Sequence, residues 1–134
     1  MIKTAGMILS LITLFQGGCE HYTSLPEMTS VSSVFIVTNE RKRIKEIADP
    51  KQMREIVDFV NMQRTNWRSP AAGVPVPSVI LEFYEGDQFK GTFGVGNGFF
   101  ETQRSGSLLS KRISHEDEKR FLDLIGVGEE MIRK

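Results

Sequence analysis

The sequence has few of the residues that build most catalytic and metal centres. It contains one cysteine, two histidines and one tryptophan in 134 residues. A single cysteine excludes a disulfide within the chain, and neither His21 nor His115 has neighbouring ligands at the spacing of a zinc site. Basic and acidic side chains number 17 each, which removes the electrostatic basis for nucleic-acid binding. We therefore predict no metal, no cofactor and no nucleic-acid partner.

Motifs of known enzyme classes are also lacking. The run Gly94, Gly96 and Gly98 superficially suggests a nucleotide-binding loop, but Phe99 and Phe100 follow it as an expected strand. Such loops lead into a helix whose first amides face the phosphates, so a tight turn is the better interpretation. Three glutamates on the expected sheet suit a solvated strand face: Glu82, Glu85 and Glu101. We predict that the protein is not an enzyme.

No hydrophobic run is long enough to span a membrane. The run from Ala5 to Phe15 covers 11 residues, whereas a transmembrane helix needs about 20. Lys3 precedes this run, and small residues follow it. A positive start, a short apolar centre and a small-residue end are typical of a secretory signal.

The only cysteine follows this signal directly. Leu14, Gly17, Gly18 and Cys19 resemble the bacterial lipoprotein signal, although Gln16 stands where that family usually has Leu. The resemblance implies that residues 1–18 are a cleaved signal peptide and that Cys19 carries lipid. It thus implies a membrane partner and a place in the cell envelope. A plain secretory signal or a chance free thiol is the alternative.

The residues after Cys19 predict how the domain is attached. By the same resemblance, Asp after the cysteine marks retention at the inner membrane, so Glu20 favours the outer membrane of a Gram-negative cell. Residues 19–32 are polar and rich in Ser and Thr, which predicts a flexible tether. The remaining residues, 33–134, suit a single small domain.

The domain is expected to be organised around a meander over residues 77–103. Alternating apolar residues predict half-buried strands with one apolar face. That face contains Val79, Leu81 and Phe83 on one strand, and Phe89, Phe93 and Val95 on the next. Turns are expected at 85–88 and 96–98, and residues 33–38 predict another strand, with a weaker one after it. The run SLLSKRI, which ends at Ile113, is a candidate for a further strand.

Two helices complete the expected fold. Asp49 before Pro50 predicts a capped helix start, with the helix running to Gln63. Ser114 predicts a second capped start, and Gly126 lies where that helix should end. This order predicts an α+β fold: an antiparallel sheet of about five strands with two helices packed on one face, in a two-layer sandwich.

Four residues are candidates for binding a partner. Trp67 and Arg68 lie on a proline-rich loop, and both residue types are enriched among interface anchors. Tyr84 and Phe100, on strand positions that alternate with the expected core face, could extend an aromatic patch. The alternative is that the helices cover them. The alternative for Trp67 is a side chain folded over the edge of the core.

These features support three hypotheses. The leading one is a lipid-anchored, non-catalytic module that binds a protein or an envelope polymer. A second is an immunity protein or inhibitor of a secreted hydrolase or toxin. A small envelope enzyme is the third, and it requires a deep pocket with convergent ionisable groups.

Overall fold

The computed structural model describes residues 22–69, 76–104 and 106–133. The predicted signal peptide, 1–18, and Cys19 lie outside the described residues. One antiparallel sheet contains six strands in the order β2-β1-β3-β4-β5-β6. The strands are β1 (Ser33–Thr38), β2 (Arg43–Ile47), β3 (Val79–Glu85), β4 (Gln88–Gly96), β5 (Phe99–Arg104) and β6 (Ser107–Arg112). The helices are α2 (Pro50–Met62) and α3 (His115–Ile125), followed by the 3-10 turn η2 (Glu129–Met131).

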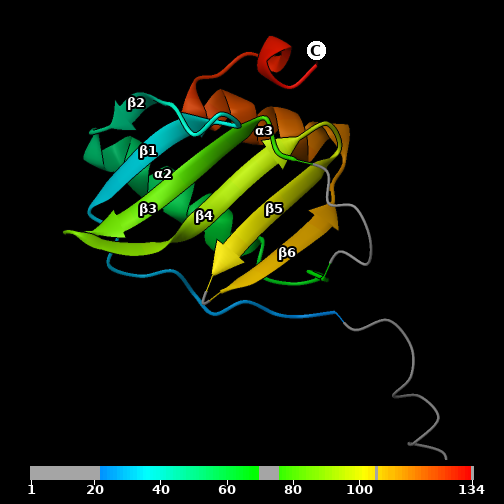
Figure 1. Cartoon of the computed structure of the whole chain (residues 1–134), viewed down its shortest axis with the longest axis horizontal. Helices are drawn as coiled ribbons and strands as arrows, with labels where there is room; N and C mark the ends of the chain where they lie inside the picture. The colour runs from blue at the N-terminus through cyan, green and yellow to red at the C-terminus, as the bar shows by residue number, and fades with distance from the viewer. Residues whose placement is uncertain (1–21, 70–75, 105, 134) are drawn as a thin grey trace, which may run out of the picture.

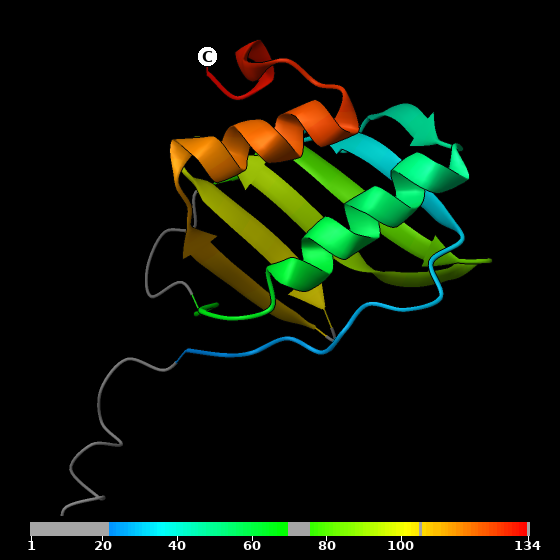
Figure 2. The same cartoon turned by 180° about the vertical axis from the view of Figure 1, so that it is seen from behind.

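Both helices lie on the same face of the sheet. Figure 1 shows the sheet in front of the helices, and Figure 2 shows the helices from the other side. The two helices contact each other, and the Gln52 side-chain amide donates to the Leu124 carbonyl at 3.2 Å. The predicted α+β sandwich is confirmed. Its sheet has six strands instead of about five, since the run SLLSKR does form the last strand.

The helix ends form as the sequence predicts. The Asp49 carboxylate accepts a hydrogen bond from the Gln52 amide at 3.2 Å, and the Ser114 hydroxyl accepts one from the Asp117 amide at 3.1 Å. Gly126 ends α3 in the left-handed conformation, with φ of 75°. Such caps satisfy amides and carbonyls that have no partner within the helix. Among the described helices, none is long and apolar enough to cross a membrane.

The core between the layers is built on aromatic rings. Phe93 is central, with its ring centroid 4.8 Å from that of Phe100 and 5.2 Å from that of Phe121. Phe59 of α2 packs against Phe121 at 5.4 Å, so the ring cluster joins both helices to the sheet. Trp67 contacts Phe93 edge-on, and its indole N–H donates to a backbone carbonyl at the end of α2. Burial of several such rings is a large part of the hydrophobic stabilisation of a small domain.

A β-bulge near the start of β4 places Phe89 and Phe93 on opposite faces of the sheet. Phe83 is paired with Gly91 and Tyr84 with Phe89, so Lys90 is an extra residue in β4. An extra residue reverses the side-chain alternation before it. The prediction that Phe89 shares a face with Phe93 and Val95 is therefore wrong: Phe89 lies on the opposite face and is 48% exposed.

The segment before β1 packs against the domain from Thr23 onward. Backbone hydrogen bonds of 2.6 and 3.2 Å pair Thr23 with Trp67. Leu25 and Met28 are buried, and the Asn61 side chain bonds both backbone groups of Met28, at 2.7 and 3.0 Å. The expectation of a flexible tether over 19–32 is thus wrong for residues 23–28. Two isolated apolar residues in a polar run gave no periodic signal for this packing.

The C-terminal end is held by a buried carboxylate. Glu118 of α3 is 1% exposed. It accepts hydrogen bonds from the Gly98 amide at 2.8 Å and from the Arg133 guanidinium at 2.5 Å. Arg133 also donates to the Asn97 side chain at 2.9 Å. Because a buried charge is costly unless it is paired, this arrangement ties the chain end to α3 and to the β4–β5 turn.

Candidate interaction surfaces

The four predicted binding residues do not form one patch. Trp67 and Phe100 are both 0% exposed, and both belong to the core. The prediction that they bind a partner is wrong in this structure, and the alternative for Trp67, a core side chain, is confirmed. For Phe100 the reason is register: it pairs with Val95, whose side chain points toward the helices.

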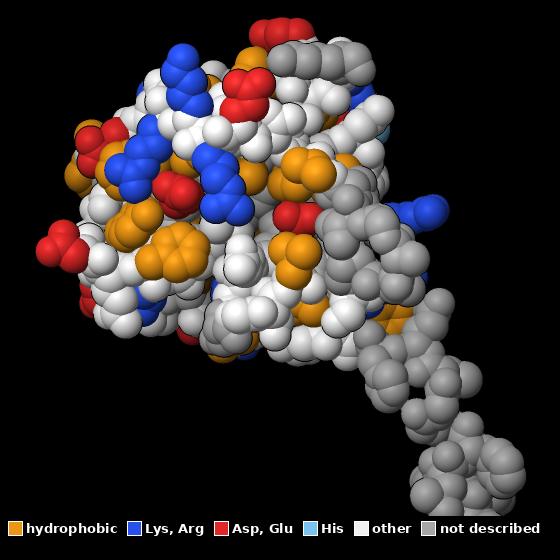
Figure 3. Space-filling view, viewed as in Figure 1, with side chains coloured by type: hydrophobic (Ala, Val, Ile, Leu, Met, Phe, Trp, Pro, Cys, Tyr) orange, Lys and Arg blue, Asp and Glu red, His pale blue; other side chains and the backbone are white. Residues whose placement is uncertain are grey.

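Tyr84 lies on the sheet face that the helices leave uncovered. Its ring centroid is 5.8 Å from that of Phe35 on β1 and 5.6 Å from that of Phe89 on β4, both in edge-on contacts. We call Phe35, Tyr84 and Phe89 the aromatic cluster. In Figure 3 apolar and charged side chains gather over the half of the sheet that contains β1 and β3. The cluster therefore presents apolar surface where no helix covers it.

Arg43 is fixed above the aromatic cluster. Its guanidinium carbon lies 3.9 Å from the Phe35 ring centroid and 5.6 Å from that of Tyr84. The same group donates to the Tyr84 hydroxyl at 3.2 Å and lies 3.4 Å from a Glu82 carboxylate oxygen. That oxygen is buried and accepts no hydrogen bond. The nearby Arg43 charge therefore offsets the cost of burying it. Stacking and pairing together limit the freedom of a side chain that is otherwise exposed.

Charged pairs and a proline lie around this cluster. Lys90 lies 3.5 Å from a Glu85 carboxylate oxygen. Farther across the same face, Pro77 lies over β4, and a Cβ added at Gly94 would come within 2.9 Å of it. Burial raises the pKa of Glu101 on the neighbouring strand β5. On the β4–β5 side, the sheet face next to the aromatic cluster is therefore partly covered by Pro77 and includes the carboxyl group of Glu101.

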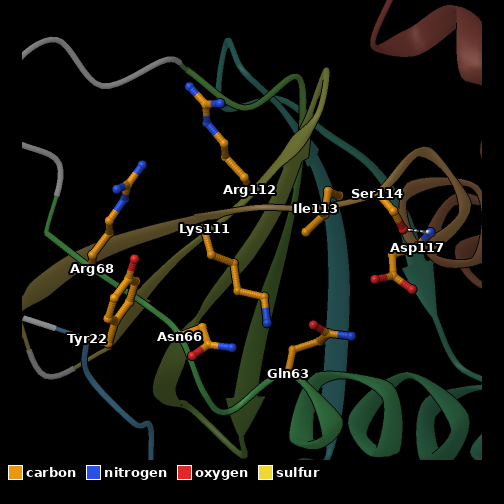
Figure 4. A pocket seen from close by; sticks show the side chains of 9 residues that line it. All are labelled: Tyr22, Gln63, Asn66, Arg68, Lys111, Arg112, Ile113, Ser114 and Asp117. Carbon is orange, nitrogen blue, oxygen red and sulfur yellow. Dashed lines mark hydrogen bonds between the residues drawn. The ribbon is translucent and has the colours of Figure 1, made fainter. Parts of the chain in front are cut away.

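Arg68 lies elsewhere, on a polar cavity beside strand β6. Its backbone pairs with Ser110 through hydrogen bonds of 3.1 and 3.0 Å, which extends the sheet beyond β6. The cavity has a volume of about 880 Å³, and Figure 4 labels its nine lining residues. Three of them are basic: Arg68, Lys111 and Arg112. We call this space the basic cavity.

Lys111 is partly buried near the end of β6, whereas Arg112 is exposed. Its ammonium donates to the Thr65 carbonyl at 3.2 Å and lies 5.4 Å from the Trp67 ring centroid. Burial lowers the pKa of Lys111, and the charge of Asp117 opposes that shift. Asp117 also lies 4.0 Å from Arg120. In Figure 4 Lys111 points toward Asn66 and Gln63, while Arg68 and Arg112 extend to the other side of the cavity.

Sequence reasoning missed most residues of both surfaces. The sequence indicates a strand at Phe35 and a basic hairpin tip at Arg43, whose other interpretation is a patch for anionic headgroups. Lys111 and Arg112 lie in a candidate strand, with no signal of a site. The Lys90–Gly91 step was the one local signal for the aromatic cluster, since glycine within a strand often marks a bulge.

Within the described ranges, no three His, Cys, Asp or Glu residues gather as a metal site. Comparison of the chain with protein-family models, curated proteins and solved structures found no match. The features that bear on function are therefore the two surfaces and the resemblance of the N-terminal sequence to a lipoprotein signal.

Proposed function

We propose that this protein is a lipid-anchored lipoprotein of the cell envelope whose domain is a non-catalytic module that binds another protein. The aromatic cluster and Arg43, on the sheet face without helices, form the binding surface. The observation that carries the proposal is Arg43, held at 3.9 Å over Phe35 and bonded to Tyr84 at a solvent-exposed position. The lipid on Cys19 attaches the module to the membrane.

The composition of this surface favours a protein over an envelope polymer. Protein interfaces have an apolar, often aromatic centre with a polar rim, and Tyr and Arg are enriched among the residues that dominate binding. Here the aromatic cluster is the centre, and the Lys90–Glu85 and Arg43–Glu82 pairs supply charges of both signs. A side chain that is already fixed loses little entropy on binding, so Arg43 suits the role of an anchor.

The test compares two exposed apolar residues on different surfaces. Phe89 is 48% exposed within the cluster, and Met62 is 68% exposed at the end of α2. The wild type, Phe89→Asp and Met62→Asp are used to capture proteins from solubilised envelopes. A captured protein is then purified, and its dissociation constant for each form is measured by calorimetry. We expect Phe89→Asp to weaken binding at least tenfold and Met62→Asp to leave it unchanged.

Equal loss in both variants, or no loss in Phe89→Asp, contradicts the proposed surface. An assay of the purified partner also separates this function from that of an inhibitor or immunity protein. If the partner is a hydrolase or toxin that the domain blocks, the second hypothesis replaces the first.

The anchor is tested independently. Cells that express the protein are labelled with radioactive palmitate, and we expect the label on the wild type but not on Cys19→Ala. Because Cys19 is the only cysteine in the chain, label that persists in Cys19→Ala contradicts acylation of this thiol.

A further inference from the structure

The basic cavity lies at the end of the domain where the chain arrives from its N-terminus. Tyr22 lines it together with the three basic residues, and Figure 4 shows Tyr22 beside Arg68. Tyr22 is three residues after Cys19. Three residues span at most about 11 Å even when fully extended. If Cys19 is lipidated, as the proposed function holds, the cavity lies close to the lipid headgroups.

The local charge of the cavity differs from that of the whole chain. The chain is neutral, with 17 basic and 17 acidic residues, whereas the cavity is lined by three basic residues and one acidic residue, Asp117. Arg120 lies near Asp117 at 4.0 Å and offsets part of its negative charge. Ser114 at the start of α3 also lines the cavity, and a helix N-terminus adds positive potential there. Together these groups favour an anion.

The other lining groups suit a ligand that has hydroxyls as well as a negative charge. Gln63 and Asn66 contribute side-chain amides, which both donate and accept hydrogen bonds. Lys111 points toward them in Figure 4. The phosphate and glycerol hydroxyls of an anionic phospholipid headgroup match this combination in the place where such headgroups are found.

We propose that the basic cavity binds the glycerophosphate headgroup of an anionic phospholipid, with Arg68 and Arg112 on the phosphate and with Lys111, beside Asn66 and Gln63, on the glycerol hydroxyls. This contact orients the anchored domain with β6 toward the membrane. Because β1 and β3 lie on the other half of the sheet, the aromatic cluster stays accessible to a protein partner. The proposal rests on the proposed lipid anchor and adds a second, non-covalent contact with the same membrane.

A second basic region provides a matched control. The hairpin that joins β1 to β2 carries Lys42, and β2 forms the edge of the sheet opposite β6. If any positive charge were sufficient for headgroup binding, Lys42 would contribute as much as Arg112. If the cavity is the binding site, Lys42 contributes little to headgroup binding.

Trp67 supplies a reporter of the soluble headgroup. It is the only tryptophan, and the Lys111 ammonium lies 5.4 Å from its ring. Full-length protein in neutral detergent is titrated with glycerol 1-phosphate, inorganic phosphate and glycerol while Trp67 emission is recorded. We expect saturable binding of glycerol 1-phosphate, weaker binding of phosphate and none of glycerol. Lys111→Gln and Arg112→Glu should each weaken binding about fivefold or more, and Lys42→Glu should not.

The membrane arm uses the lipidated protein in vesicles of phosphatidylcholine, with or without phosphatidylglycerol. We expect phosphatidylglycerol to slow hydrogen exchange around the cavity in the wild type and in Lys42→Glu, but not in Arg112→Glu. Arg112 is exposed, so its substitution tests the site even if Lys111→Gln does not fold. Equal effects of Lys42→Glu and Arg112→Glu overturn the proposal. So does binding of inorganic phosphate as tightly as glycerol 1-phosphate, which would indicate a site for free phosphate.

The two proposals fail separately. Absence of palmitate on Cys19 contradicts the anchor, whereas the glycerol 1-phosphate titration does not depend on lipidation. Absence of binding in that titration overturns the headgroup site and leaves the anchor intact.

Discussion

The two faces of the sheet carry similar aromatic residues with different consequences. On the covered face Phe93 and Phe100 are fully buried beneath the helices. On the uncovered face Phe35 and Phe89 both pack against Tyr84, and Arg43 lies over Phe35 and Tyr84. Residue type therefore does not separate core from surface in this protein. For Phe89 the deciding feature is one extra residue in β4, which turns its side chain to the uncovered face.

The largest expected difference between the faces is in stability. Phe93→Ala removes the central ring of the core and should lower the free energy of unfolding by about 3–5 kcal/mol. Phe89→Ala should lower it by less than about 1 kcal/mol, because that ring is already half exposed. Urea unfolding followed by circular dichroism measures both changes. Similar losses of stability for the two variants would contradict the assignment of Phe93 to the core and of Phe89 to the surface.

A smaller effect is expected at the bulge itself. Gly91 has φ of 138°, and a Cβ there would lie 2.8 Å from the Gln103 carbonyl oxygen. Gly91→Ala should therefore cost about 2 kcal/mol or more of stability through strain and contact with the neighbouring strand.

Gly106→Ala is the control for the bulge. Gly106 also has a positive φ, 79°, but a Cβ there meets nothing within 4 Å. Its cost should be only about 1 kcal/mol, the penalty for the left-handed conformation. If the two alanine variants unfold at the same urea concentration, steric contact at Gly91 does not hold the bulge in place.

The smallest effect concerns pH on the uncovered face. Because burial raises the pKa of Glu101 above its ordinary value of about 4.5, the folded state binds more protons than the unfolded state just above that value. Stability should therefore fall as pH rises through this window and then level off. Glu101→Gln should remove this fall and raise stability at pH 7 by less than about 1 kcal/mol, since the side chain is partly solvated. Urea unfolding at a series of pH values from 4 to 7 checks the sign, and a wild-type stability that rises over that window relative to Glu101→Gln would contradict it.

Much of the fold was predictable because its signals are local. The capped ends at Asp49, Ser114 and Gly126 depend on residues within one turn of each helix. Strict alternation over Val79, Leu81 and Phe83 gave the correct face of β3 for the same reason. The α+β class follows from the order of these elements.

The binding surfaces were not predictable in the same way, because they depend on register between distant strands. Arg43 meets Tyr84 only because β1 lies between β2 and β3. Trp67 was placed on a proline-rich loop, which suggested exposure, but its pairing with Thr23 carries it into the core. No residues close in sequence to Arg43 or Trp67 predict these contacts.

The packing of residues 23–28 determines where the protein can be truncated without loss of core contacts. A shortened form beginning at Ser33, where the first strand starts, would lose Leu25 and Met28 from the hydrophobic interior and leave the Asn61 amide without its backbone partners. Trp67 would lose the neighbouring strand-like segment that shields it. A version that begins at Glu20 keeps all of these contacts and lacks Cys19, the residue that we propose carries lipid.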